Sequence, residues 1–126
     1  MLTQALAYGE RIREPGLALL EAPGNDAVSS TALVAAGATV VLFTTGRGTP
    51  LGFPAPTLKI ASNTALAERK PRWIDFDAGV VLAGVAMADA GEALMDLVLA
   101  TASGLPTKAE ENGEREIALW KRGVTL

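Results

Sequence analysis

Short apolar runs that alternate with helix-capping signals are the feature that most constrains the fold of this chain. Such alternation is typical of α/β domains with a parallel sheet. The apolar runs predict four strands, at residues 17–22, 39–43, 58–61 and 73–76. With 126 residues, nearly half of them hydrophobic, the chain has the size of one domain. We therefore expect residues 1–126 to form a single three-layer α/β domain with a mainly parallel, Rossmann-like sheet.

A capped helix separates the first two predicted strands. Asn25 or Asp26 can begin this helix, because Asn and Asp are preferred N-caps, and Gly37 can end it. Together these elements predict a βαβ unit with a right-handed crossover. Ahead of them, the apolar side chains before Gly9 predict a further short helix.

Two more helices are expected in the second half of the chain. Ser62 or Asn63 can cap a brief helix after the third strand. The clearest helix covers residues 89–103, where Asp89 stands three residues before a glutamate, the spacing of a capping box. The tail at residues 114–126 carries enough apolar side chains to dock on the domain.

Composition narrows the chemistry that this chain can perform. It has no cysteine and no histidine, which excludes disulfides, thiolate nucleophiles and the commonest ligand of borderline metals. Any catalysis must use carboxylates, lysine, arginine, hydroxyls or backbone dipoles. A net charge of −3 with mixed signs argues against a nucleic-acid partner. Neither a membrane-spanning run nor a secretory signal is visible, so we expect a cytoplasmic protein with no membrane contact.

The most informative motif follows the second strand and reads Leu42-Phe43-Thr44-Thr45-Gly46-Arg47-Gly48-Thr49-Pro50. In open α/β sheets, ligands bind at the carboxyl ends of the strands. Gly46 and Gly48 would let the backbone approach a ligand closely, and Arg47 offers a planar fork of donors for a carboxylate or phosphate. The alternative is a tight turn with a solvated arginine.

Three other places carry candidate groups. Asn25 and Asp26 can simply cap their helix, or bind an anion there with Asp26 as a metal ligand. Lys59 is either an exposed lysine on an edge strand or a carboxylate binder; if partly buried, its pKa would fall and it could act as a base. Asn63 can cap its helix or bind a sugar hydroxyl.

Asp75 and Asp77 form a pair of carboxylates at positions i and i+2. They share one face if the strand persists, and two carboxylates on one face suit a hard divalent cation. The alternative is one solvated aspartate and one turn aspartate. Trp73 and Trp120 are expected in the core or at an interface.

Several segments together resemble the carboxy-terminal part of the altronate/galactarate dehydratase family of sugar-acid hydro-lyases, and the likeness covers almost the whole chain in order. The pattern is closer to altronate than to galactarate dehydratases. Asp77 departs from it, because the family pattern has Asn there. The stretches that carry the resemblance are Ala22-Pro23-Gly24-Asn25-Asp26, residues 42–50 as written above, Leu58-Lys59-Ile60, Lys70-Pro71-Arg72-Trp73-Ile74-Asp75-Phe76, Ala102-Ser103-Gly104, Glu111-Asn112-Gly113, Arg115-Glu116-Ile117-Ala118 and Gly123-Val124-Thr125-Leu126.

The resemblance implies an enzyme that dehydrates an altronate- or galactarate-type sugar acid to a 2-keto-3-deoxy sugar acid. It also implies a divalent metal, iron(II) or manganese, and two preceding domains, so the chain would be a fragment or the product of a split gene. The small sugar acid and the preceding domains, or a partner subunit, are the expected partners, and a homo-oligomer is compatible with this. We expect the isolated chain to be inactive, because the missing histidines would sit on those domains.

Within this frame each candidate residue has an expected role. Arg47 would grip the substrate carboxylate, and hydroxyls and backbone amides around it would bind the carboxylate oxygens. Lys59 is the candidate base. The remaining expected binders are Thr44, Thr45, Gly46, Gly48, Asn25 and Asn63, and the expected metal ligands are Asp26 and Asp75. The rival functions are a phosphate- or nucleotide-binding module and a non-catalytic packing domain.

Overall fold

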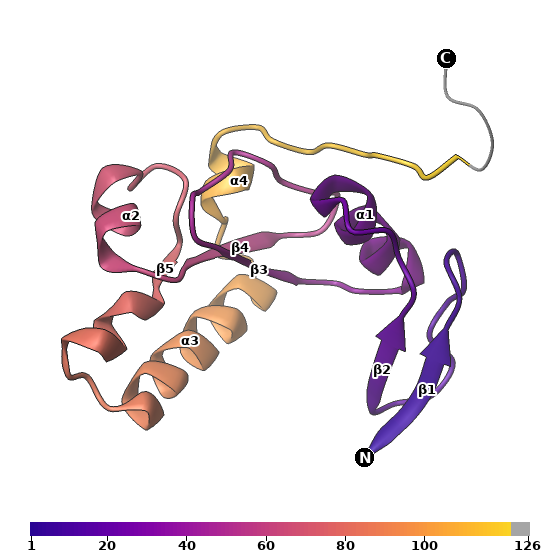
Figure 1. The fold of residues 1–126 in the computed structure, drawn as a ribbon, viewed down its shortest axis with the longest axis horizontal. Coiled ribbons are helices and arrows are strands. Elements are labelled where there is room, and N and C mark those ends of the chain that lie inside the picture. The colour runs from indigo at the N-terminus through magenta and orange to yellow at the C-terminus, as the bar shows by residue number, and fades with distance from the viewer. Residues whose placement is uncertain (122–126) are drawn as a thin grey trace.

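Strands and helices are interspersed along residues 1–121, the part of the chain that the computed structural model describes (Figure 1). Every strand pairing among these residues is parallel. The predicted α/β class and parallel pairing are confirmed. The elements are β1 (Leu2–Leu6), β2 (Leu17–Leu20), α1 (Asp26–Ala36), β3 (Val41–Thr45), β4 (Thr57–Ala61), α2 (Thr64–Arg69), β5 (Phe76–Asp77), the 3-10 helix η1 (Ala78–Ala83), α3 (Met87–Ala102) and α4 (Lys108–Glu111).

The strands divide between two sheets. One contains β1 and β2, and the other has the order β3-β4-β5. The predicted βαβ unit is therefore wrong, because β2 and β3, which flank α1, belong to different sheets. β2 pairs instead with β1, in a segment for which we predicted a helix. In β1, Leu2, Gln4 and Leu6 are spaced at the strand period of two, and Leu6 is the buried residue among them.

β4 is the centre of the second sheet, and all five of its residues are buried. A strand with neighbours on both sides and both faces covered is expected to read as a continuous apolar run, which β4 does except at Thr57 and Lys59. One buried cluster joins Val41, Phe53 and Ala55. A second cluster, around Ala61, binds α2 to the sheet. The core thus follows the line of β4.

Helix boundaries agree with the capping signals in two cases out of three. The Asn25 side chain accepts a hydrogen bond from Val28 N and starts α1, and Asn63 starts α2 in the same way. Gly37 ends α1 with φ at 123°, a conformation that favours glycine. The predicted capping box at Asp89 is wrong, because α3 begins at Met87 and Asp89 lies inside its first turn.

The segment after α2 contains less strand than the sequence predicts. Strand structure is restricted to β5, and Asp77 then caps η1 through Gly79 N. The tail leaves α4 and runs back across the molecule toward α1 (Figure 1). It is held there by Thr31 Oγ1, which accepts from Ala118 N, and by the hydroxyl of Tyr8, which accepts from Trp120 N. These two backbone amides hold the tail as far as Trp120. The expected docking through apolar side chains is wrong for Ile117 and Leu119, which are 67% and 77% exposed. Residues 122–126 of the predicted tail lie outside the described residues.

Candidate functional site

The loop after β3 and the start of α2 meet at the carboxyl edge of the β3–β4–β5 sheet. The strands are parallel, with Thr45 opposite Ala61, so both chain segments leave the sheet side by side. Ser62 N donates to the carbonyl of Thr45 at 3.0 Å, and Asn63 Nδ2 donates to the carbonyl of Gly46 at 3.4 Å. The structure therefore brings Asn63 to the predicted binding loop.

The backbone of this loop has a fixed conformation. Thr45 Oγ1 accepts from Gly48 N at 2.9 Å, which closes a tight turn around Gly46 and Arg47. Gly48 has φ of 79°, and a Cβ there would lie 3.0 Å from Leu66 Cδ1. Glycine is needed at this position both for its conformation and for the space. The side chain of Arg47 is exposed.

Lys59 lies beneath the loop and is fully buried, with 0% of its surface exposed. Its ammonium donates to the carbonyls of Thr49 at 3.2 Å and Pro50 at 2.7 Å. Burial lowers the pKa of Lys59, although the carboxylates of Asp75, Glu114 and Glu116 act in the opposite direction. The interpretation as an exposed edge lysine is wrong, because β4 is a central strand. The predicted burial is present, but this position gives the amine no access to a substrate in solvent.

A second lysine reaches the same loop from its other side. Lys70 Nζ donates to the carbonyl of Arg47 at 3.1 Å and to that of Gly48 at 3.5 Å. The ammonium also lies 4.4 Å from the ring centroid of Trp73, a cation–π geometry. Sequence reasoning assigned no role to Lys70; its spacing from Trp73 was the only available signal.

Asp75 is a structural carboxylate. One oxygen accepts from Lys59 N at 2.7 Å and the other from Lys108 N at 2.8 Å, so Asp75 joins β4 to the start of α4. Burial raises the pKa of Asp75, and these two hydrogen bonds act against that rise. Asp77 accepts from Gly79 N and serves as a turn aspartate. The two carboxylates therefore bind backbone amides of different segments.

The predicted metal pair is not assembled in the described part of the chain. Asp26 is exposed at the start of α1, which lies beside the end of the sheet where β3 and β4 begin (Figure 1). Asp75 lies beside β5, towards the other end. Residues 1–121 contain no group of three or more His, Cys, Asp or Glu side chains that could hold a metal ion. Asp26 and Asp75, the two expected metal ligands, therefore lie apart in the described residues.

Asn25 is likewise separated from the loop. Its side chain accepts from Val28 N, as an N-cap does, and the following Ala27 packs against Val41, Phe53 and Ala55. Asn25, which was expected to bind the substrate together with the Arg47 loop, therefore does not lie at that loop. The connection from β2 places α1 at the amino-terminal end of β3, whereas the Arg47 loop follows its carboxyl end.

Two acidic residues of the tail complete the surroundings of Lys59. Glu116 Oε2 accepts from Gly52 N at 2.9 Å, and Glu116 N donates to Gly52 O. Burial acts to raise the pKa of Glu116, but the hydrogen bonds that its carboxylate accepts, from Gly52 N among others, and the charge of Lys59 together lower the pKa below its ordinary value. A side-chain hydrogen bond with Glu116 raises the pKa of Glu114. The tail therefore holds the far end of the loop that Lys59 supports.

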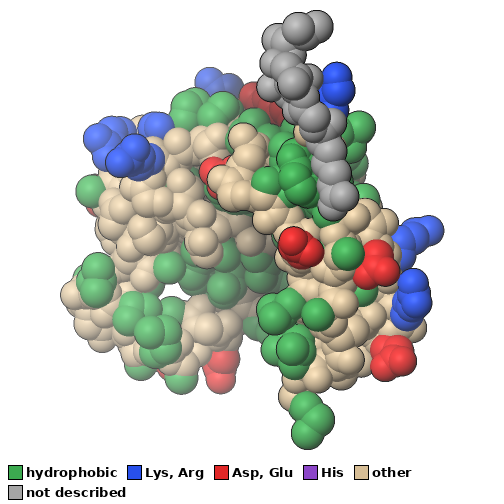
Figure 2. Space-filling view, turned by 45° about the vertical axis from the view of Figure 1, so that its right-hand side comes forward, with side chains coloured by type: hydrophobic (Ala, Val, Ile, Leu, Met, Phe, Trp, Pro, Cys, Tyr) green, Lys and Arg blue, Asp and Glu red, His purple; other side chains and the backbone are tan. Residues whose placement is uncertain are grey.

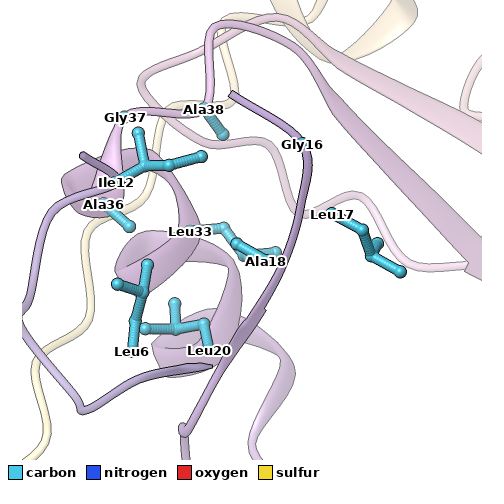
Figure 3. A pocket seen from close by; sticks show the side chains of 10 residues that line it. All are labelled: Leu6, Ile12, Gly16, Leu17, Ala18, Leu20, Leu33, Ala36, Gly37 and Ala38. Atoms are coloured by element: carbon cyan, nitrogen blue, oxygen red, sulfur yellow. The ribbon is translucent and has the colours of Figure 1, made fainter. Parts of the chain in front are cut away.

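Two hollows in the described part of the chain are lined mainly by apolar side chains. A groove of about 340 Å³ lies between β2 and α1, where Ala18 faces Leu33 and Leu6 lies beside Leu20 (Figure 3). A second hollow, of about 320 Å³, lies beside Ser62 and is lined mainly by apolar side chains of η1 and α3. Hydrophobic side chains also gather in several exposed groups on the face shown in Figure 2. Apolar hollows of this kind suit other polypeptide better than a sugar acid.

Comparison with known proteins gives one consistent family. Residues 1–125 match the model of the D-galactarate/altronate dehydratase carboxy-terminal domain. The chain is 52% identical to altronate dehydratase of Escherichia coli over 100% of its length, and 48% identical to altronate dehydratase of Bacillus subtilis over 99%. It is 39% identical over 82% of its length to the L-threo-forming galactarate dehydratase of Escherichia coli. These matches cover 26%, 25% and 20% of the relatives, so the chain spans about a quarter of their length or less. No helix within residues 1–121 is long and apolar enough to cross a membrane.

Proposed function

Since this chain belongs to the D-galactarate/altronate dehydratase family, as its carboxy-terminal domain, we propose that it supplies the carboxylate-binding loop of a sugar-acid hydro-lyase. The proposed reaction is the dehydration of an altronate-type acid to a 2-keto-3-deoxy acid. The relatives are altronate and galactarate dehydratases, which supports this substrate class, and the higher identity to the altronate dehydratases favours altronate over galactarate.

The observation that carries the proposal is the loop at residues 44–48. It presents an exposed Arg47 from a backbone that Thr45, Gly48 and Asn63 hold in one conformation. Proton abstraction beside a carboxylate builds negative charge on the carboxylate oxygens. A guanidinium can neutralise that charge through two parallel hydrogen bonds. Thr44 is exposed next to it and offers a further donor.

The base and the metal are proposed to come from the rest of the enzyme. This proposal is supported by the burial of Lys59 and by the hydrogen bonds that both oxygens of Asp75 accept from backbone amides. Iron(II) or manganese remains our proposal for the complete enzyme, with its ligands outside residues 1–121. The residues described here would then bind and orient the substrate.

The preceding domains are proposed to cover the apolar surface of η1 and α3. Leu82, Val85, Met87, Met95 and Leu99 are all exposed there. Leu82 and Met87 line a hollow that also includes Ser62, which follows β4 at the same carboxyl edge as the loop. A domain packed on this surface would face the loop at residues 44–48, and the substrate would bind between the loop and that domain.

A domain exchange tests the proposal. This chain would replace the matching carboxy-terminal part of the Escherichia coli altronate dehydratase, to which it is 52% identical. We expect the hybrid to dehydrate altronate and the 126-residue chain alone to show at most a trace rate. In the hybrid, Arg47→Lys should lose activity on the order of a hundredfold, because a point charge cannot copy a bidentate grip.

Arg69→Lys is the matched control, because Arg69 is an exposed arginine on α2. Full activity of the Arg47→Lys hybrid would contradict the role given to Arg47. Full activity of the chain alone would contradict the shared site. Binding of inorganic phosphate at the loop, with no effect of altronate, would favour the phosphate-binding alternative.

A further inference from the structure

Two lysines from different elements share four consecutive backbone carbonyls. Lys59 of β4 donates hydrogen bonds to the carbonyls of Thr49 and Pro50 from the interior of the domain. Lys70, the C-cap residue of α2, donates hydrogen bonds to the carbonyls of Arg47 and Gly48 from the partly exposed side. Residues 47–50, here named the clamped loop, thus turn every carbonyl toward an ammonium group.

Each lysine is itself held in place. Lys59 is fully buried, and a buried ammonium needs acceptors close to it, which the loop carbonyls provide. Lys70 lies over the ring of Trp73, and its side chain packs against Gly48, where a Cβ would lie 3.0 Å from Lys70 Cδ. The bare Cα of Gly48 therefore leaves the room that the Lys70 side chain occupies. Charge-assisted hydrogen bonds of this kind are stronger than neutral ones.

We propose that Lys70 and Lys59 are positioning residues that hold the carbonyls of the clamped loop inward, so that Arg47 is presented outward to the substrate. The second half of this inference rests on the proposed function of the loop, and the first half does not. Neither lysine needs to touch the substrate. Their effect on the reaction passes through the geometry of Arg47.

Amide hydrogen exchange of the 126-residue chain, followed residue by residue by NMR, tests the clamp directly. The probe is Gly48 N–H, which donates to Thr45 Oγ1 within the loop. We expect Lys70→Met to speed its exchange about tenfold, because the local opening becomes easier. Lys70→Arg should restore slow exchange, and Arg69→Met, a neighbouring cation without the clamp, should leave it unchanged. Unchanged exchange in Lys70→Met would overturn the inference.

Lys59 has its own signature and does not need to be substituted. Its hydrogen-bonded ammonium should give slowly exchanging proton signals with cross-peaks to Thr49 and Pro50, and the absence of these contacts would overturn its part in the clamp.

The hybrid enzyme separates the two halves of the inference. Lys70→Met should raise the KM for altronate more than it lowers kcat, with rescue by Lys70→Arg. Faster Gly48 exchange with unchanged kinetics would confirm the clamp and contradict the substrate role of the loop.

Discussion

The β3–β4–β5 sheet and the β1–β2 pair are both parallel, but they are stabilised in different ways. In the larger sheet the central strand β4 is buried along its whole length, and its polar groups all have partners: Lys59 binds two carbonyls and Thr57 Oγ1 donates to Ala55 O. In the smaller sheet Leu17 is 62% exposed and Leu19 is 57% exposed. Of the nine residues in β1 and β2, only Leu6 is buried.

The larger sheet is stabilised by contacts within the chain, whereas the smaller sheet exposes apolar side chains that a partner surface could cover. Buried hydrogen bonds have strict geometry, so the larger sheet has one defined arrangement and can hold a binding loop without help. A two-stranded sheet alone is only marginally stable, and exposed leucines on it are typical of a surface that other polypeptide covers. The site therefore lies on the self-sufficient part of the domain.

The strongest way to break this comparison is to remove the carboxylate that ties the larger sheet together. Asp75→Ala leaves the amides of Lys59 and Lys108 without their acceptor, and we expect a loss of about 3 kcal/mol in the free energy of unfolding. Urea unfolding measures it. Asp26→Ala, which removes an exposed carboxylate, should cost much less. Equal losses would show that the hydrogen bonds of Asp75 contribute no more to stability than an exposed carboxylate does.

A glycine provides a second, smaller test of the same sheet. A Cβ on Gly79 would lie 2.7 Å from Asn63 Cα, which real contacts essentially never allow, so Gly79→Ala should cost about 2 kcal/mol. Gly91 in α3 has open space around its Cα, and there the same change should stabilise the helix by up to about 1 kcal/mol. Thermal unfolding of both variants decides whether packing at the η1–α2 contact is as tight as we infer.

Local signals in the sequence were reliable where one residue decides the outcome. Asn25 and Asn63 were predicted as caps and act as caps, and Gly37 ends its helix. The family resemblance was also found from motifs alone. The capping box of Thr107 and Glu110 was not predicted, although the Thr-x-x-Glu spacing is a local signal for it.

Non-local partners could not be predicted in the same way. Whether β2 pairs with β1 or β3 depends on which strand lies beside it, and an apolar run looks the same in both cases. The role of Asp75 depends on amides that are 16 and 33 residues away. The clamp on residues 47–50 depends on Lys70, which is over 20 residues away. The loop proposed to bind substrate was therefore visible in the sequence, whereas the residues that support it were not.

The pH dependence of stability sharpens the assignment of Lys59 as a buried, held cation. Its pKa is lowered from 10.5, so between that lowered pKa and 10.5 the unfolded chain binds more protons than the folded chain. This group therefore makes the protein more stable as the pH rises toward 10.5. The free energy of unfolding of the wild type and of Lys59→Met can be measured with urea at several alkaline pH values. As the pH rises toward 10.5, the wild type should gain stability relative to Lys59→Met. A pH-independent difference would contradict the lowered pKa.

The smallest expected effect concerns the β1–β2 pair and tests whether it awaits a partner surface. Leu19 is more than half exposed in the described chain, so Leu19→Thr, which keeps a good strand former, should change the free energy of unfolding by no more than about 0.5 kcal/mol. In the hybrid dehydratase, where other domains are present, the same substitution should lower thermal stability more than it does in the 126-residue chain. Leu58→Ala, at a buried position of β4, should instead cost about 3 kcal/mol in both settings. An equal and small effect of Leu19→Thr in both settings would show that its side chain stays in water, and the contrast between the two sheets would then reflect strand number alone.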